Sequence, residues 1–206
     1  VEIMPVVKAD AYRHGAVEVS RVLEREGVRW LAVSSVEEGA TLRGSGVKAR
    51  ILVMADFLPG EREGLLEYGL TPVIHAVEDI ASWDALCARH GARAAFHLKI
   101  DSGMGRLGTR AEAAHIAAAV KGCAHGRFEG LMTHFASSAD YTSSQTGEQV
   151  GRFDAVRAGL EAEGVRMRFI GRREGVSKRL VERMAWAEAE TAANDRITLY
   201  GAFNYG

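Results

Sequence analysis

The chain has 206 residues, of which 47% are hydrophobic and 26% charged, and its formal net charge is -1. A chain of this size and composition can bury one sizeable core, so one globular domain is the default expectation. Its basic residues are scattered among acids, which argues against a nucleic-acid partner. The sequence shows neither an apolar run of membrane-spanning length nor the order of a signal peptide, so a cytoplasmic location without a membrane span is expected.

Eight short apolar runs alternate with amphipathic stretches, which is typical of βα units that build a parallel sheet. Strands are predicted at residues 3–8, 30–33, 51–54, 71–74, 94–100, 128–135, 166–170 and 197–201. Helices are predicted at residues 17–26, 36–43, 61–68, 77–90, 111–120, 145–163 and 176–193, with start signals at Ser35 and Pro59. The pattern predicts an α/β fold of the (βα)₈ TIM-barrel type. A doubly wound open sheet is the competing interpretation, because periodicity does not distinguish a closed sheet from an open one.

Polar residues follow several of the predicted strands directly. The first strand ends at Lys8, the fifth at Lys99 and Asp101, and the sixth at Thr133 and His134. Barrel active sites lie at the carboxyl ends of the strands, so these side chains are expected at one mouth. A lysine buried there among apolar neighbours is suited to imine chemistry, whereas a lysine that reaches the rim has no such role.

The segment GMGRLG, with Gly103, Gly105 and Gly108, matches the letter pattern of a dinucleotide fingerprint. That fingerprint belongs to the first βα turn of a doubly wound fold, whereas this segment follows the fifth strand. The favoured interpretation is a tight backbone turn from which Arg106 presents a cation to an anionic oxygen.

Three segments, VVKADAYRHGA, LKIDSGMGRLG and EGLMTHFASSAD, together resemble the alanine racemases, which are pyridoxal-phosphate enzymes with a barrel and a separate β-domain. The resemblance implies that Lys8 binds pyridoxal phosphate covalently and acts as one of two bases. It also implies that Tyr12 contacts the cofactor phosphate, Arg106 faces the phenolic oxygen and His134 packs beside the ring. Lys99, which members of the family often carry as a carbamate, would steady Arg106.

The resemblance extends over about residues 1–164 and implies an isomerase that interconverts L- and D-alanine for peptidoglycan precursors. Alanine is then the substrate, and the full-length family is expected to form homodimers. Arg13 departs from the family, which has glycine there, and is expected to point outward.

Residues 165–206 resemble undecaprenyl diphosphate synthases, the cis-prenyl transferases, through RFIG, LVERMAWAEAETA and AFNYG. The chain is therefore predicted to consist of a cofactor-binding barrel segment, 1–164, and a prenyl-transferase-like segment, 165–206, packed as the end of the same domain. The barrel is then either incomplete or closed by grafted seventh and eighth βα units.

The prenyl-transferase-like segment, residues 165–206, affects the activity that is expected of the chain. By the resemblance, Asn194 stands where the family has the arginine that bonds the pyridine nitrogen, and Arg196 stands where it has a small glycine near the phosphate. The second base is a tyrosine of the partner subunit's β-domain, a region expected to be missing from what looks like an excised piece. The hypothesis is a truncated or chimeric racemase with little or no activity. The alternatives are a non-catalytic pyridoxal-phosphate barrel and a fragment of an undecaprenyl diphosphate synthase.

Cysteines and the remaining histidines give no further site. Cys87 and Cys123 have no CxxC partner and are predicted to be reduced thiols. The other histidines show no ligand spacing, so no metal site is expected: His75, His90, His97, His115 and His125.

Overall fold

The computed structural model describes residues 2–55, 59–138, 142–175 and 197–202. In this part of the chain eight strands form one curled sheet, in which every neighbouring pair is parallel. The strands are β1 (Glu2–Pro5), β2 (Trp30–Val33), β3 (Arg50–Val53), β4 (Thr71–Ile74), β5 (Ala94–Lys99), β6 (Gly126–His134), β7 (Phe169–Gly175) and β8 (Ile197–Ala202).

The order of the strands in the sheet is β1-β8-β7-β6-β5-β4-β3-β2, so β1 and β2 are its two outer members. These two strands also meet. Val6 forms a parallel bridge with Ala32, and the backbone N–H of Val7 donates to the carbonyl oxygen of Ala32 at 2.8 Å. The sheet therefore curls back on itself, which confirms the predicted barrel class and excludes the doubly wound open sheet.

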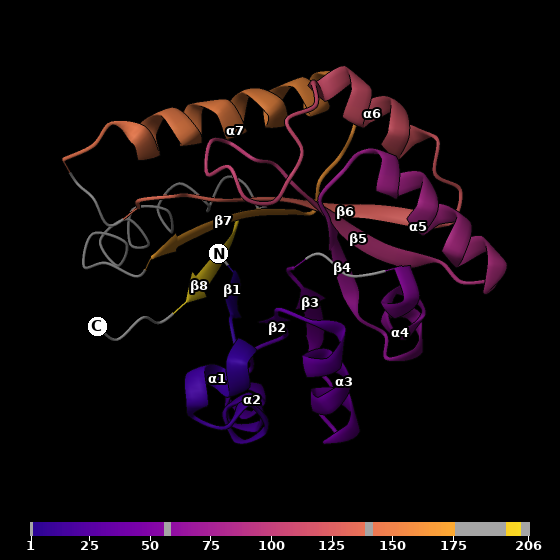
Figure 1. Ribbon diagram of the computed structural model, residues 1–206, viewed down its shortest axis with the longest axis vertical. Coiled ribbons are helices and arrows are strands. Elements are labelled where there is room, and N and C mark those ends of the chain that lie inside the picture. The colour runs from indigo at the N-terminus through magenta and orange to yellow at the C-terminus, as the bar shows by residue number, and fades with distance from the viewer. Residues whose placement is uncertain (1, 56–58, 139–141, 176–196, 203–206) are drawn as a thin grey trace.

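Helices lie outside the ring of strands (Figure 1). They are α1 (Lys8–Arg13), α2 (Ala16–Arg25), α3 (Val36–Gly44), α4 (Arg62–Glu67) after a 3₁₀ turn (Pro59–Glu61), α5 (Glu78–Arg89), α6 (Ala113–Lys121) and α7 (Gln145–Ala162). The start signal at Ser35 is confirmed, because its side chain accepts from the N–H of Glu38 and Glu38 caps in return. The helix predicted at 176–193 lies outside the described residues.

Side-chain alternation along the strands divides the apolar core in two. One set fills the interior of the barrel: Met4, Val6, Trp30, Ala32, Leu52, Met54, Val73, Met132 and Phe169. The larger set lies between the outer faces of the strands and the helices, and includes Leu31, Ile51, Phe96 and Leu131. This two-sided burial explains why the strands appear in the sequence as continuous apolar runs.

A partly buried ion pair, between Glu129 and Arg50, lies at the amino-terminal end of the barrel interior. The Glu129 carboxylate is 1% exposed, and Arg50 donates to both of its oxygens, at 3.1 Å and 2.6 Å. Burial raises the pKa of Glu129, but the contacts with His97, Arg50 and Arg127 outweigh burial and lower the pKa to about 2. Glu129 is therefore a carboxylate at neutral pH, and Arg50 is its main partner.

Two further sequence predictions concern thiols and membranes. Cys87 and Cys123 are both free, as predicted, and burial raises the pKa of Cys123 to about 11. Among the described residues, no helix combines the length and the apolar character that a membrane crossing requires.

Candidate functional site

The chain turns in an unusual way immediately after β1. Residues Ala9, Asp10, Ala11 and Tyr12 have φ between 49° and 56° and ψ between 40° and 49°, so α1 is a single left-handed turn. Each such residue costs about 1–2 kcal/mol relative to the right-handed form. Strain of this kind persists where the surroundings hold it, and it often marks a functional site. Lys8 and Tyr12 are at the two ends of this turn.

Two carboxylates hold the left-handed turn by accepting hydrogen bonds from backbone N–H groups. Glu38 accepts through Oε1 from the N–H of Ala9 at 2.7 Å and through Oε2 from the N–H of Ser34 at 2.7 Å. Asp10 accepts from the N–H of Ala16, also at 2.7 Å, at the start of α2. The sequence marked Ser35 as the start of a helix but gave no signal that Glu38 contacts the residue after Lys8.

Arg13 continues the left-handed backbone with φ of 71°. Its side chain is exposed, in agreement with the expectation that it points outward. Glycine adopts this conformation without the steric cost that arginine carries. We therefore expect Arg13→Gly to leave the free energy of unfolding unchanged or to raise it by about 1 kcal/mol, measured by urea unfolding. A loss of more than about 1 kcal/mol would show that the arginine side chain stabilises the turn.

The carboxyl ends of β5 and β6 place two further predicted site residues side by side. Lys99, the last residue of β5, is 4% exposed and pairs in register with Met132 of the barrel interior. Paired residues of parallel strands face the same side, so Lys99 points into the barrel. His134 is two residues after Met132 and shares its face. Thr133 lies between Met132 and His134 in the sequence. Its hydroxyl hydrogen-bonds that of Ser102 at 2.7 Å, and this bond ties β6 to the loop after β5.

The glycines of the GMGRLG loop have the backbone role that the sequence predicted. Gly103, Gly105 and Gly108 have φ of 136°, 73° and 113°. A Cβ on Gly108 would lie 2.8 Å from the backbone nitrogen of Asp101, so only glycine allows the loop to pack against the end of β5. The dinucleotide interpretation is wrong, because the loop follows β5 and opens no helix: α6 starts only at Ala113.

The Asp101 side chain, just before the GMGRLG loop, holds the backbone of this loop in place. Its carboxylate accepts from the N–H of Gly103 at 3.1 Å, the N–H of Gly105 at 2.9 Å and Nε of Arg110 at 2.8 Å. Burial raises the pKa of Asp101, but these donors together lower it below its usual value. Arg106, within this loop, is exposed.

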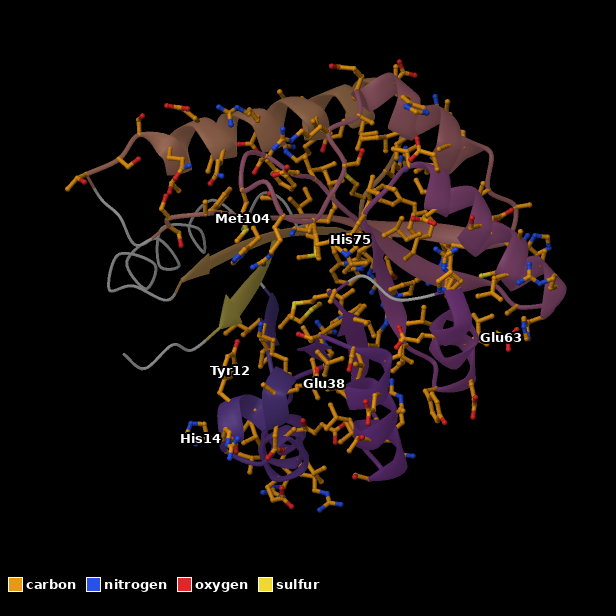
Figure 2. All side chains as sticks on the ribbon, viewed as in Figure 1. Tyr12, His14, Glu38, Glu63, His75 and Met104 are labelled. Carbon is orange, nitrogen blue, oxygen red and sulfur yellow. The ribbon has the colours of Figure 1, made fainter. Side chains whose placement is uncertain are left out.

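The structure thus brings the predicted residues to one mouth of the barrel. Lys8 is half-buried after β1, Tyr12 packs against the interior apolar cluster, and Lys99 and His134 end β5 and β6. Figure 2 shows Tyr12 projecting from α1, and it shows Met104 in the loop after β5 that also carries Arg106. An amine, a phenol, an imidazole and a guanidinium at one mouth can bind a small anionic ligand and transfer protons to it.

Comparisons with known proteins agree with this arrangement. The profile of the family described as "Alanine racemase, N-terminal domain" matches residues 1–171. An alanine racemase of Halothermothrix orenii is 41% identical over 161 residues, which are 78% of this chain and 42% of that protein. An alanine racemase of Carboxydothermus hydrogenoformans is 35% identical over 202 residues, which are 98% of this chain and 54% of that protein. The chain thus spans about half the length of the curated relatives it matches.

Solved structures of alanine racemases are also similar to this chain, in its fold as well as its sequence. The alanine racemase of Clostridium difficile 630 superposes with a TM-score of 0.84 at 28% identity, over 98% of this chain and 54% of that one. An alanine racemase from a D-cycloserine-producing Streptomyces lavendulae gives a TM-score of 0.79 at 26% identity, over 96% of this chain and 51% of that one.

The comparisons give no support to the resemblance of residues 165–206 to undecaprenyl diphosphate synthases. The Carboxydothermus hydrogenoformans match extends over 98% of the chain and so includes most of this segment. In the structure, β7 pairs with β6 and β8 pairs with β1, so the backbone of both strands completes the same sheet. Asn194 and Arg196 lie outside the described residues.

Proposed function

The chain belongs to the alanine racemase family, and from this premise we propose that its described residues form the lysine half of a pyridoxal-phosphate site. The observation that supports the proposal is the convergence of three segments at the carboxyl mouth of the barrel. Lys8 comes from the left-handed turn, and Lys99 and His134 come from adjacent strands.

The chemistry of the side chains at this mouth fits pyridoxal phosphate. The cofactor carries an aldehyde, which matches the amine of Lys8, and a phosphate, which matches the phenol of Tyr12. Its phenolic oxygen matches the guanidinium of Arg106, and its aromatic ring matches the imidazole of His134 as a packing partner. When bound, the cofactor supplies an electron sink for negative charge at the α-carbon of an amino acid.

The proposed roles of the residues follow from their positions. Lys8 would hold the cofactor through Nζ and, once the amino group of alanine has displaced it there, would use the freed amine to exchange a proton with the α-carbon of alanine on one face. Tyr12, at the far end of the same turn, would hold the phosphate. Lys99, directly before the GMGRLG loop, would steady Arg106 from the barrel interior as a carbamate, whose negative charge suits the guanidinium.

We propose that these 206 residues by themselves bind the cofactor but racemise alanine slowly or not at all. The region to which the family resemblance assigns the second base is not among them. Loss of one general base typically costs about 10²- to 10⁴-fold in rate. Conversion of L- to D-alanine is therefore expected to be at least roughly a hundredfold below that of a full-length relative measured in parallel. A rate within tenfold of that relative would contradict this expectation.

Covalent labelling tests the cofactor site directly. The purified chain is incubated with pyridoxal phosphate, reduced with borohydride and digested, and the labelled peptide is identified by mass. We expect the label on the peptide that contains Lys8, and we expect Lys8→Ala to lose it. Lys121→Ala is the matched control, because Lys121 is an exposed lysine on α6 that pairs with Glu163. Equal labelling of the wild type and Lys8→Ala would refute the proposal.

A further inference from the structure

One face of α7 contacts both of the loops that follow β5 and β6. Gln149 and Arg152 are three residues apart in this helix, so their side chains leave it on the same face. Phe153, which is fully buried beside them, anchors that face in the apolar core. Figure 2 shows the loop after β5, labelled at Met104, between α7 and the strands.

Gln149 holds the loop after β6. Its side chain is fully buried, and its Oε1 accepts from the backbone N–H of Ala136 at 3.0 Å. Ala136 is two residues after His134, and Phe135 between them is 2% exposed. The bond from Ala136 to Gln149 therefore fixes the backbone immediately beyond His134, the residue proposed to pack beside the cofactor ring.

Arg152 holds the loop after β5. Its Nη1 donates to the carbonyl oxygen of Ser102 at 3.0 Å, and its Nη2 donates to Glu148 at 3.3 Å. The buried hydroxyl of Ser102 pairs with that of Thr133, which in turn donates to the carbonyl oxygen of Ile100 at 2.9 Å. The two loops are thus joined to each other as well as to the helix.

Gly103 lets both helix side chains approach the loop after β5. A Cβ at this position would lie 2.5 Å from Nη1 of Arg152 and 3.2 Å from Nε2 of Gln149. The φ of 136° is also one that other residues rarely adopt. Because glycine has no side chain, a single turn of α7 reaches the loop that carries Arg106 and the loop beyond His134 at the same time.

The amide of Gln149 has a cost that stability alone does not explain. In the described part of the chain its buried Nε2 has no hydrogen-bond acceptor. A buried donor without an acceptor destabilises the folded state, whereas a methionine of similar size would fill the space without this penalty. Methionine lacks the oxygen that accepts from Ala136. The amide is therefore explained by the place where it holds Ala136.

We propose that Gln149 and Arg152 are positioning residues of the site at the carboxyl mouth. From one turn of α7 they hold the loops of His134 and Arg106 in a single arrangement, so that both side chains face one bound ligand. The identity of that ligand rests on the proposed function, whereas the order of the two loops is measurable without any ligand.

Gln149→Met separates positioning from packing, because it keeps the size of the side chain and removes the acceptor. The N–H of Ala136, an exposed residue, can then bond water, so we expect a urea midpoint equal to that of the wild type or higher. Amide exchange in the peptide over residues 134–138, measured without cofactor, should become roughly tenfold faster. Gln149→Glu should do the reverse, because its carboxylate still accepts from Ala136 while its buried charge lowers the urea midpoint.

Arg152→Met tests the second contact of the helix at a side chain that is 58% exposed, so the variant is expected to fold. Amide exchange in the peptide over residues 101–108 should become roughly tenfold faster. With cofactor present, both Gln149→Met and Arg152→Met should need roughly tenfold more pyridoxal phosphate for half-maximal borohydride-trapped labelling at Lys8.

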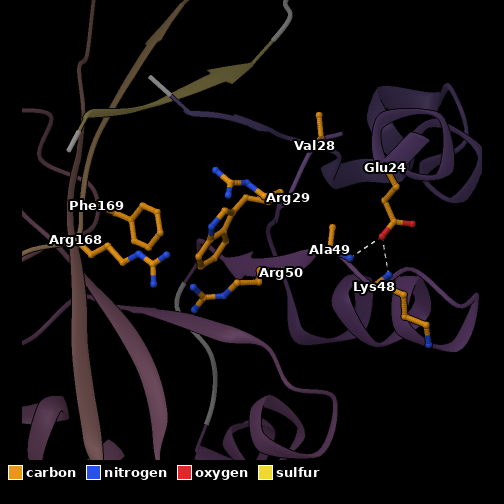
Figure 3. Close-up of a pocket in the computed structure, with 9 residues that line it drawn as sticks. Glu24, Val28, Arg29, Lys48, Ala49, Arg50, Arg168 and Phe169 are labelled. Atoms are coloured by element: carbon orange, nitrogen blue, oxygen red, sulfur yellow. Dashed lines mark hydrogen bonds between the residues drawn. The ribbon is translucent and has the colours of Figure 1, made fainter. Parts of the chain in front are cut away.

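Two other changes to methionine are the controls. Arg157→Met alters the same helix at a residue that pairs with Glu161 instead of with a loop. Lys48→Met alters an exposed side chain of the pocket where the strands begin, at the opposite end of the barrel (Figure 3). Both variants should exchange and label as the wild type does.

The exchange and labelling results separate the two proposals. The positioning role is overturned if Gln149→Met and Arg152→Met leave exchange in the loops or labelling at Lys8 unchanged. It is also overturned if exchange rises only in step with a loss of overall stability. A wild type that takes up no pyridoxal phosphate counts against the proposed function alone, because exchange without cofactor still decides whether Gln149 and Arg152 order the loops.

Discussion

Glu129→Ala is expected to lower the free energy of unfolding by about 3 kcal/mol at pH 7. The carboxylate has a pKa of about 2 in the folded chain and 4.5 when unperturbed, and each pKa unit corresponds to about 1.4 kcal/mol. Its removal also leaves the Arg50 guanidinium against Trp30 without its bidentate partner. Urea unfolding of the wild type and the variant measures the difference.

The difference in free energy of unfolding between the wild type and Glu129→Ala depends on pH. At pH 7 Glu129 is ionised in both the folded and the unfolded state, so its stabilisation is complete. As the pH falls below 4.5 the unfolded chain takes up a proton that the folded chain resists until about 2, so this stabilisation is lost. The gap between wild type and variant should therefore narrow by about 1.4 kcal/mol between pH 7 and about pH 3.5.

His97 adds an acid sensitivity of its own, which Glu129 reduces in the wild type because the carboxylate raises the pKa of this imidazole against the effect of burial. Burial lowers its pKa below 6.5 in the folded chain, so protonation favours the unfolded chain as the pH falls below 6.5. Glu161→Ala is the control for Glu129, because Glu161 forms an exposed helical pair with Arg157 and should change stability by no more than about 0.5 kcal/mol. The assigned role of Glu129 would be disproved if the wild type and Glu129→Ala differed in free energy of unfolding by the same amount at pH 7 and about pH 3.5. It would also be disproved if they differed by less than about 1 kcal/mol at pH 7.

Glu38→Gln is expected to loosen the left-handed turn that carries Lys8 and Tyr12. A carboxylate accepts at both oxygens, whereas the amide of glutamine places a donor against one of the N–H groups of Ala9 or Ser34. Loss of one such bond corresponds to roughly tenfold faster amide exchange in the turn. Hydrogen exchange of the peptide over residues 7–13, read by mass spectrometry, measures the effect.

The turn also sets the position of the proposed cofactor lysine, so Glu38→Gln should reduce borohydride-trapped labelling at Lys8 in parallel. Glu37→Gln is the matched control, since Glu37 is an exposed neighbour in the same first turn of α3. The control should leave both exchange and labelling unchanged. If Glu38→Gln lowers overall stability but leaves exchange at Ala9 and labelling at Lys8 as in the wild type, Glu38 has a structural role only.

The strands and their polar ends were predictable from the sequence because each depends on local pattern. Strands at 30–33 and 71–74 match the structure at both ends, and the placement of Lys99 and His134 at strand ends followed directly. The seventh strand was predicted at 166–170 and begins later, at Phe169, where its pairing with Gly130 starts. Strand pairing is tertiary, so apolar pattern alone does not fix such a boundary.

Other features depended on contacts between segments distant in sequence. The left-handed turn gave no signal, because alanine, aspartate and tyrosine at these positions favour the right-handed form. The contacts of Glu38 and Asp10 that hold the turn become visible only in the structure. The arginines appeared scattered along the chain. Arg50, Arg127 and Arg168 meet around Glu129 only because the barrel brings the starts of β3, β6 and β7 together.

The closure of the barrel affects the order in which the chain acquires its site during synthesis. β1, which leads to Lys8, pairs with β8 along four residues but meets β2 at a single bridge. In Figure 1, β1 and β8 accordingly lie side by side. On the ribosome, β1 is synthesised long before residues 197–202, so β1 is at first without β8, its main pairing partner. A nascent chain can therefore form the left-handed turn early, through Glu38, but should fix the strand that leads to Lys8 only after the eighth strand has been translated.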